Sequence, residues 1–224
     1  MPPVRPLGPR QTSRSRLGWR PAQDEHRWWP RARNLGLRSG ALLATLLALS
    51  IAQLGRADDQ LVPIQLEAQL FAKVLTYDRN YPDRAGQMAR VLLVMKKDHA
   101  DSVRVASQMQ SALRSIAQIG GISHEEIVVP FGGAAALADL VKASAAAAVF
   151  FGPGFDDDVD AIKQALDGYD VLTAGSVPEY VPHGIVLGFD IVSGSPKLLV
   201  HLTQAKRQHV SLRAELLRLA RIFE

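Results

Sequence analysis

The chain of 224 residues contains no cysteine. This absence excludes structural disulfides, thiolate metal sites and a cysteine nucleophile, but it does not decide the compartment. The sequence also lacks the phosphate-binding patterns GxxxxGKS/T and GxGxxG, the GxSxG element of serine hydrolases, and close histidine pairs such as HxH or HExxH. We therefore predict no cofactor, no metal and no catalytic residue, in a protein that is not an enzyme.

The net charge of +4 is unevenly distributed along the chain. Residues 1–57 hold ten arginines and two acidic residues, for a net charge of +8, and all three tryptophans. The remaining residues hold 16 basic and 20 acidic side chains, for a net charge of −4. The basic character belongs to the first region alone, so we expect no nucleic-acid partner for the rest.

Residues 1–57 have the order of a secretory signal. Residues 1–40 are rich in proline, arginine and glycine without apolar periodicity, which predicts disorder. The apolar run at residues 40–51 is shorter than the roughly 20 residues that span a bilayer, and the small residues Gly55 and Ala57 flank a candidate cleavage site. An uncleaved anchor and a buried core helix are the alternatives. We predict a disordered basic leader and signal over 1–57, a folded domain over 58–224 without stable lipid insertion, and a periplasmic location.

Residues 148–175 predict the central unit of that domain. The apolar run Val149-Phe150-Phe151 is typical of a buried strand, and Gly152-Pro153-Gly154 ends it. Asp156, Asp157 and Asp158 then stand where carboxylates cap a helix start, and Val171-Leu172-Thr173 begins a second buried strand. A strand, a helix and a strand of this length predict a parallel sheet with a right-handed crossover.

The other segments extend this α/β pattern. We expect helices over 61–80, 99–119 and 134–144, a polar loop over 77–84, and strands over 91–95 and 127–129. Segments 184–192 and 197–201, joined by turn residues 193–196, predict a hairpin, and the apolar periodicity of 203–223 predicts a long final helix with a basic solvated face. The fold class is therefore α/β: a single domain with a mostly parallel sheet flanked by helices, a C-terminal β-hairpin and a long C-terminal helix.

Few residues indicate a site. Loops at the carboxyl ends of parallel strands bind ligands in such folds, so the candidate ligand-binding residues are Gly152, Gly154, Phe155, Gly175 and Ser176. The favoured interpretation of the glycine segment itself is a turn followed by a helix cap, with ligand binding as the alternative. The aspartates 156–158 do not fit a calcium loop. We interpret His124-Glu125-Glu126, and the charges of Arg79, Asp83 and Arg84, as solvated surface.

Several segments of residues 60–224 together resemble the YfiR-like family of periplasmic regulatory proteins. They are the first helix (PIQLEAQLFAKVLTYD), residues 149–175 ending in VLTAG, the segment HGIVLGF at 183–189, and LLVHL at 198–202 followed by LRAELLRLARI at 212–222. The resemblance implies an α/β domain that is often dimeric, and a role in the cyclic di-GMP pathway. The best-studied members restrain an inner-membrane diguanylate cyclase. This chain differs from that branch by having no cysteine, and it has His201 where the family usually has asparagine.

Two function classes follow. The first is a periplasmic regulator that binds an inner-membrane sensor protein, with an exposed apolar patch on the first or last helix as its expected signature. The alternative is a periplasmic small-molecule-binding protein with a ligand crevice at the carboxyl edge of the sheet. An enzyme would need a cluster of perturbed ionisable residues in that crevice, which the sequence does not reveal.

Overall fold

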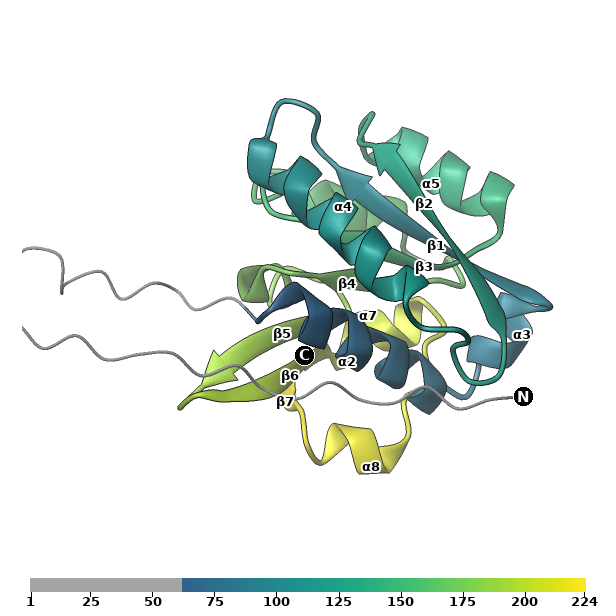
Figure 1. Ribbon diagram of the computed structural model, residues 1–224, viewed down its shortest axis with the longest axis vertical. Helices are drawn as coiled ribbons and strands as arrows, with labels where there is room; N and C mark the ends of the chain where they lie inside the picture. The colour runs from purple at the N-terminus through teal and green to yellow at the C-terminus, as the bar shows by residue number, and fades with distance from the viewer. Residues whose placement is uncertain (1–61) are drawn as a thin grey trace, which may run out of the picture. The chain divides into compact units, whose positions relative to one another are not determined.

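The computed structural model describes residues 62–224, whose strands form one seven-stranded sheet in the order β2-β1-β3-β4-β5-β6-β7 (Figure 1). The strands are β1 (Met88–Met95), β2 (Ser123–Pro130), β3 (Ala146–Phe151), β4 (Leu172–Gly175), β5 (Leu187–Val192), β6 (Ser195–His201) and β7 (Arg221–Phe223). All neighbouring pairs are parallel except β5 and β6. The predicted mostly parallel sheet is confirmed, whereas the predicted leader and signal lie outside the described residues.

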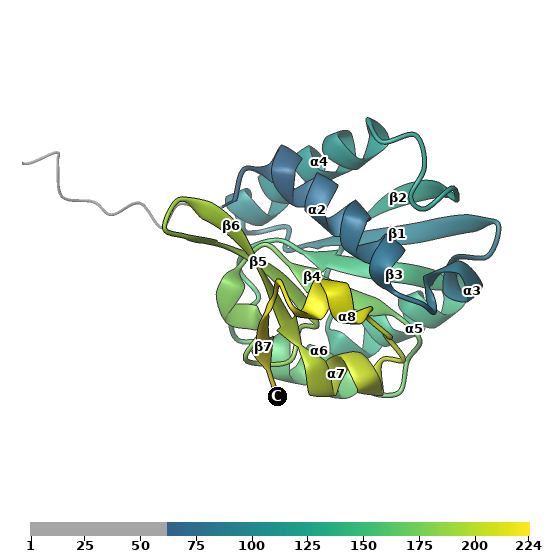
Figure 2. The ribbon, with the colours of Figure 1, turned by 90° about the horizontal axis from the view of Figure 1, so that it is seen from below.

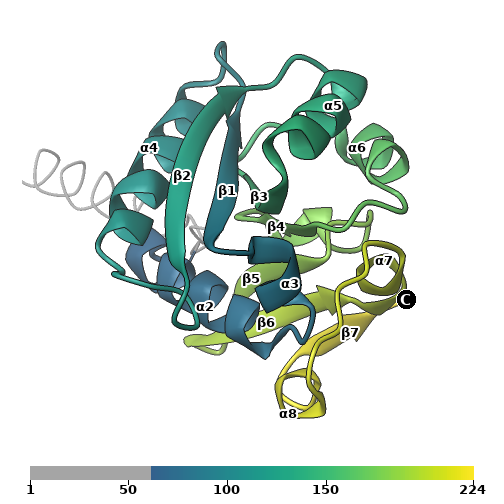
Figure 3. The same cartoon turned by 90° about the vertical axis from the view of Figure 1, so that its right-hand side faces the viewer.

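Helices cover both faces of the sheet. They are α2 (Ile64–Tyr77), α3 (Tyr81–Ala85), α4 (Ala100–Arg114), α5 (Ala134–Ser144), α6 (Val159–Ala165), α7 (Leu202–Arg207) and α8 (Ala214–Leu217), with a short 3₁₀ turn at Pro178–Tyr180. Figure 3 shows α2 and α4 on one face and α5 and α6 on the other. Along β1, Val91 and Leu93 pack into the core under α2 and α4, and Leu92 and Val94 into the core under α5 and α6. A central parallel strand buried on both faces has no polar side, which explains its unbroken apolar run.

The predicted hairpin is confirmed. Strands β5 and β6 pair antiparallel through a two-residue turn, Ser193-Gly194, in which φ is +53° and +76°. Two positive φ values are what a type I′ turn requires, and its twist matches that of the strands. Pro196, expected in the turn, lies instead inside β6.

The predicted long C-terminal helix is wrong. The segment folds into α7, an extended stretch, α8 and the short edge strand β7 (Figure 2). His209, with φ of +53°, ends the first helical piece. Ser211 then donates its backbone N–H to Asp78 Oδ1 over 2.8 Å and accepts from the N–H of Arg79 over 2.9 Å. These contacts with the turn after α2 outweigh the helical periodicity of the segment.

The interpretation of Arg84 as a solvated loop charge is also wrong. Residues 81–85 form α3, and the Arg84 side chain is only 3% exposed. Its Nη1 lies 2.9 Å from Oδ2 of the fully buried Asp78, and its Nε lies 2.8 Å from Oδ1 of Asp170. Arg79 and Asp83, in contrast, are exposed as expected.

His124 and Glu126 are buried rather than solvated. Strand β2 begins at Ser123, four residues earlier than expected, and places these two side chains on the same side of the strand. The His124 ring donates from Nε2 to the carbonyl oxygen of Ile116 over 2.8 Å, and its Nδ1 hydrogen-bonds to the Glu126 carboxylate. The buried polar groups of His124 and Glu126 are therefore satisfied by each other and by the carbonyl oxygen of Ile116.

His201 has a structural role at the start of α7. Its Nδ1 accepts the backbone N–H of Gln204 over 3.3 Å, which caps the helix. Burial, together with the charges of Lys163 and Arg207, lowers the pKa of His201 and keeps the ring neutral, as an acceptor must be. Asparagine, expected here from the family resemblance, is among the best helix-capping residues. The histidine therefore supplies the same kind of acceptor.

Candidate functional site

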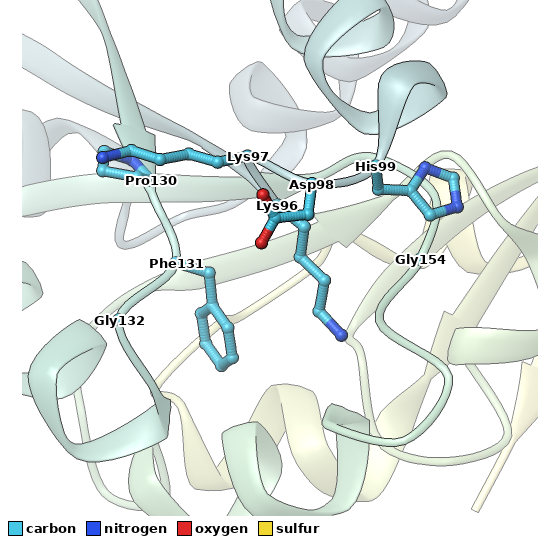
Figure 4. Close-up of a pocket in the computed structure, with 8 residues that line it drawn as sticks. All are labelled: Lys96, Lys97, Asp98, His99, Pro130, Phe131, Gly132 and Gly154. Carbon is cyan, nitrogen blue, oxygen red and sulfur yellow. The ribbon is translucent and has the colours of Figure 1, made fainter.

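An open pocket of about 600 Å³ lies at the carboxyl edge of the sheet, between the loops that follow β1, β2 and β3 (Figure 4). Its lining consists of Lys96, Lys97, Asp98, His99, Pro130, Phe131, Gly132 and Gly154. Four of these follow β1, three lie at the end of β2 or just after it, and Gly154 follows β3. The pocket therefore brings together three segments that are well separated in the sequence.

The strand order explains why a pocket forms at this place. Strand β1 pairs with β2 on one side and with β3 on the other. After β1 the chain forms β2 on one side of it. The chain then crosses back past β1 and forms β3 on its other side. The helices that follow β1 and β3 therefore lie on opposite faces, which leaves a crevice outside the strand ends. Open α/β sheets bind their ligands at such topological switch points.

Hydrogen bonds fix the walls of the pocket. The backbone N–H of Lys96 donates to Oγ of Ser102 over 3.0 Å, and Nδ1 of His99 accepts the backbone N–H of Ser102 over 3.2 Å. Across the crevice, the N–H of Phe131 donates to the carbonyl oxygen of Met95 over 2.8 Å. The loops after β1 and β2 are thus tied to the first turn of α4 and to each other. The site is largely formed before any ligand arrives.

Gly154 allows the β3 loop to approach His99. Its φ is +94°, and a Cβ atom at this position would lie 2.7 Å from Cδ2 of the His99 ring. A larger residue would need both a strained backbone and a displaced imidazole. The glycine predicted from the sequence therefore serves the close packing of two pocket walls.

The charges at the pocket are partly balanced. Lys96 forms an ion pair with Asp158, and its Nζ lies 5.4 Å from the centroid of the Phe155 ring. Asp158 was expected to cap α6, but its side chain makes no capping hydrogen bond and pairs with Lys96 instead. Lys97 and Asp98 are exposed, and neither has an ion-pair partner within residues 62–224.

The first turn of α5 also faces this edge. The residue before the helix is Gly133, which has no side chain to accept from the free N–H groups of the first turn, and that turn carries no acidic residue. Such a helix start presents unpaired donors and the positive end of the helix dipole. Gly132, the preceding residue, lines the pocket.

Of the five candidate ligand-binding residues, Gly154 lines the pocket and the other four are buried nearby. Gly152 packs against Ser102, whose carbonyl oxygen would lie 3.3 Å from an added Cβ. Phe155 is fully buried, with its ring 5.2 Å from that of Phe131 in an edge-to-face arrangement. Phe155 therefore packs beneath Phe131, which lines the pocket, and does not line the pocket itself.

Gly175 and Ser176 lie farther along the edge, after β4. A Cβ on Gly175 would lie 3.0 Å from the Tyr180 ring, and the Ser176 hydroxyl donates to the carbonyl oxygen of Phe151 over 3.4 Å. Neither residue is among those that line the pocket. Sequence reasoning missed the charged segment 96–99 and Phe131, although both directly follow predicted strands, which was the available signal.

The described part of the chain has no group of three or more histidine, aspartate or glutamate side chains that could hold a metal ion. Within the same residues, no helix combines the length and the apolar character needed to cross a membrane.

The solved structures that resemble this chain share little sequence with it. A conserved domain protein from Vibrio cholerae O1 biovar El Tor is 12% identical, with a TM-score of 0.49, over 72% of this chain and 60% of that protein. The ABC domain from Streptococcus pneumoniae in complex with L-Trp is 10% identical, with a TM-score of 0.51, over 72% of this chain and 62% of that protein. The chain thus spans about 60% of the length of these two structures. At 10% identity, the likeness to the Streptococcus pneumoniae domain extends to the fold alone.

No curated protein matches the chain. Residues 64–221, by contrast, match the YfiR/HmsC-like family. The match begins at the first residue of α2 and ends at the first residue of β7, so it spans every helix and strand from α2 to α8 and reaches the start of β7. The chain therefore belongs to the YfiR/HmsC-like family.

Proposed function

We propose that this chain is a periplasmic regulatory protein that restrains a membrane-bound signalling protein, such as a diguanylate cyclase, by direct contact. Family membership supports the general role of a periplasmic regulator of diguanylate cyclase signalling. Members of this family are regulators rather than enzymes. The partner and the contact surface are the new parts of the proposal.

The observation that favours a contact surface lies in the last segment of the chain. Leu219 is 68% exposed and Ile222 is 38% exposed, next to the exposed side chains of Arg218 and Arg221. We call these four residues the C-terminal surface. Isolated exposed leucines are ordinary, but two apolar side chains flanked by arginines resemble the centre and rim of a protein interface. Their charge favours a partner with an acidic rim.

The C-terminal surface is anchored firmly to the domain. Strand β7 pairs with β6 at the edge of the sheet, and Arg213 donates its backbone N–H to the carbonyl oxygen of Tyr77 over 3.0 Å. As an edge strand, β7 also keeps one row of backbone groups free for a partner. A fixed surface loses little conformational freedom on binding, which favours affinity.

Photo-crosslinking in intact cells of the native host tests this proposal. The full chain carries the photoreactive residue p-benzoylphenylalanine in place of Leu219, and a matched control carries it in place of Met88, which is 47% exposed at the start of β1. We expect position 219 to crosslink an inner-membrane protein that has a periplasmic domain and a diguanylate cyclase domain. Position 88 should give at least about tenfold less of that product.

Two results would contradict the proposal. Equal yields of the adduct from both positions would mean that the C-terminal surface is not the contact. Crosslinking of position 219 only to a second copy of the chain would make it a homodimer surface instead.

A second candidate function is binding of a small molecule, which the pocket at the switch point favours. Its position outside the ends of β1 and β3 is the one at which this sheet type holds ligands. Gly152, Gly154, Phe155, Gly175 and Ser176 remain predicted members or supports of that site.

A further inference from the structure

The pocket combines one free positive side chain with one free negative one. Lys96 is neutralised by Asp158, so the ionic character of the lining rests on Lys97 and Asp98. Figure 4 shows the Lys97 side chain extending to the side of Pro130, away from His99. Taken alone, these two charges cancel.

Neutral hydrogen-bond donors beside the pocket then favour an anionic ligand. Next to Gly132, the start of α5 adds backbone N–H groups that no side chain of residues 62–224 accepts from. These donors are fixed, and they complement negative charge without carrying a full positive charge.

The opposite wall of the pocket is apolar. Phe131 is half-buried, stands edge-to-face against Phe155, and is drawn in Figure 4 with its ring below the charged segment. Pro130 extends the same wall. A ligand held by its charge at Lys97 would therefore place its remaining atoms against an aromatic surface.

From this arrangement we infer that the pocket binds a small monocarboxylate with an apolar body. The carboxylate is held by Lys97 and the start of α5, and the body lies on Phe131. A doubly charged phosphate is disfavoured, because Asp98 lines the pocket and the carboxylate of Asp158 stands beside it. This inference rests on the second candidate function above.

Four probes separate the contributions of charge and body: 3-phenylpropionate, the neutral 3-phenylpropan-1-ol, phenyl phosphate and acetate. Binding is followed by NMR on protein produced from the full chain, through the backbone amide signals of Gly132 and Gly154. We expect saturable shifts of both signals with 3-phenylpropionate, and affinity at least about tenfold weaker for the other three probes. Lys97→Gln should weaken 3-phenylpropionate roughly three- to fivefold, the range of one exposed charge pair. Lys142→Gln, at the far end of α5, is the matched control and should change nothing.

Each failure has its own signature. If the alcohol binds as tightly as 3-phenylpropionate, the carboxylate class is wrong while a small-molecule site at this edge stands. If phenyl phosphate binds more tightly, the limit to a single charge is wrong. If no probe shifts Gly132 or Gly154, both the inference and the second candidate function fail. If Lys142→Gln weakens binding as much as Lys97→Gln does, Lys97 does not hold the carboxylate and the inference fails, while the second candidate function stands.

Discussion

Arg84→Ala is expected to lower the free energy of unfolding by roughly 3–5 kcal/mol, the range found when one partner of a buried ion pair is removed. The reason is the burial of Asp78, whose side chain has no exposed surface and lies 2.9 Å from the Arg84 guanidinium. Without the arginine, that carboxylate keeps its cost of dehydration and loses its counter-charge. For a domain of this size, the melting temperature should fall by roughly 10 °C.

The loss should spread to the C-terminal segment. Besides Asp78, the guanidinium group bonds to Asp170 and to the carbonyl oxygen of His209, at 2.8 and 3.3 Å. Asp78 in turn accepts from the backbone N–H of Ser211. Hydrogen exchange at Ser211 and Arg213 should therefore accelerate more in the variant than exchange in β1 or β3.

Urea unfolding followed by circular dichroism measures the effect, and Arg104→Ala is the matched control. Arg104 also pairs with an aspartate, Asp101, at 2.8 Å, but both side chains are more than half exposed. Such pairs contribute little, so the control should unfold almost like the parent. A variant with Arg84→Met and Asp78→Asn removes both charges, keeps an acceptor for Ser211, and should recover part of the loss. If Arg84→Ala behaves like Arg104→Ala, the buried pair is not a main support of the fold.

The predictions that succeeded depended on local patterns. The run Val149-Phe150-Phe151 had to be a central strand, because only a strand buried on both faces is apolar without alternation. The turn Ser193-Gly194 gave the hairpin for a similarly local reason. The final helix failed because its fate depends on Asp78, which lies 133 residues before Ser211 in the chain. No periodicity within residues 203–223 carries that information.

The candidate site was only partly predictable for the same reason. Gly154 could be found because glycines after a parallel strand point to the carboxyl edge. Lys97 and Phe131 also follow predicted strands, but their meeting in one pocket depends on β1 lying between β2 and β3. Strand order is a property of the whole sheet, and a polar loop residue looks the same in sequence whether it faces a pocket or open solvent.

Glu67→Gln should stabilise the domain increasingly as the pH rises. Glu67 is on α2, four residues before Phe71, and this spacing places it on the buried side of the helix. It is 2% exposed, and its Oε1 has no hydrogen-bond partner within residues 62–224. Burial raises the pKa of Glu67 to about 8.

The sign follows from comparing the two states. In the unfolded chain the carboxyl has its ordinary pKa of 4.5, so it ionises first there. Below pH 4.5 the carboxyl is protonated in both the folded and the unfolded state, so its ionisation does not change the free energy of unfolding. As the pH rises from 4.5 toward 8, the unfolded state gains a charge that the folded state resists, and stability falls by about 1.4 kcal/mol per pH unit. Glutamine has no such proton, so Glu67→Gln removes this slope.

Urea unfolding at about pH 5 and about pH 7.5 measures the difference. The free energy of unfolding of Glu67→Gln, relative to the parent, should rise by roughly 3 kcal/mol between these two values. The absolute difference at about pH 5 also contains the cost of burying an amide, so the change with pH is the quantity that isolates the carboxyl. Glu125→Gln, at an exposed position on β2, is the control and should show no such rise. If the two variants change alike with pH, Glu67 ionises in the folded state near its ordinary pKa, and the interior under α2 must admit water or a cation.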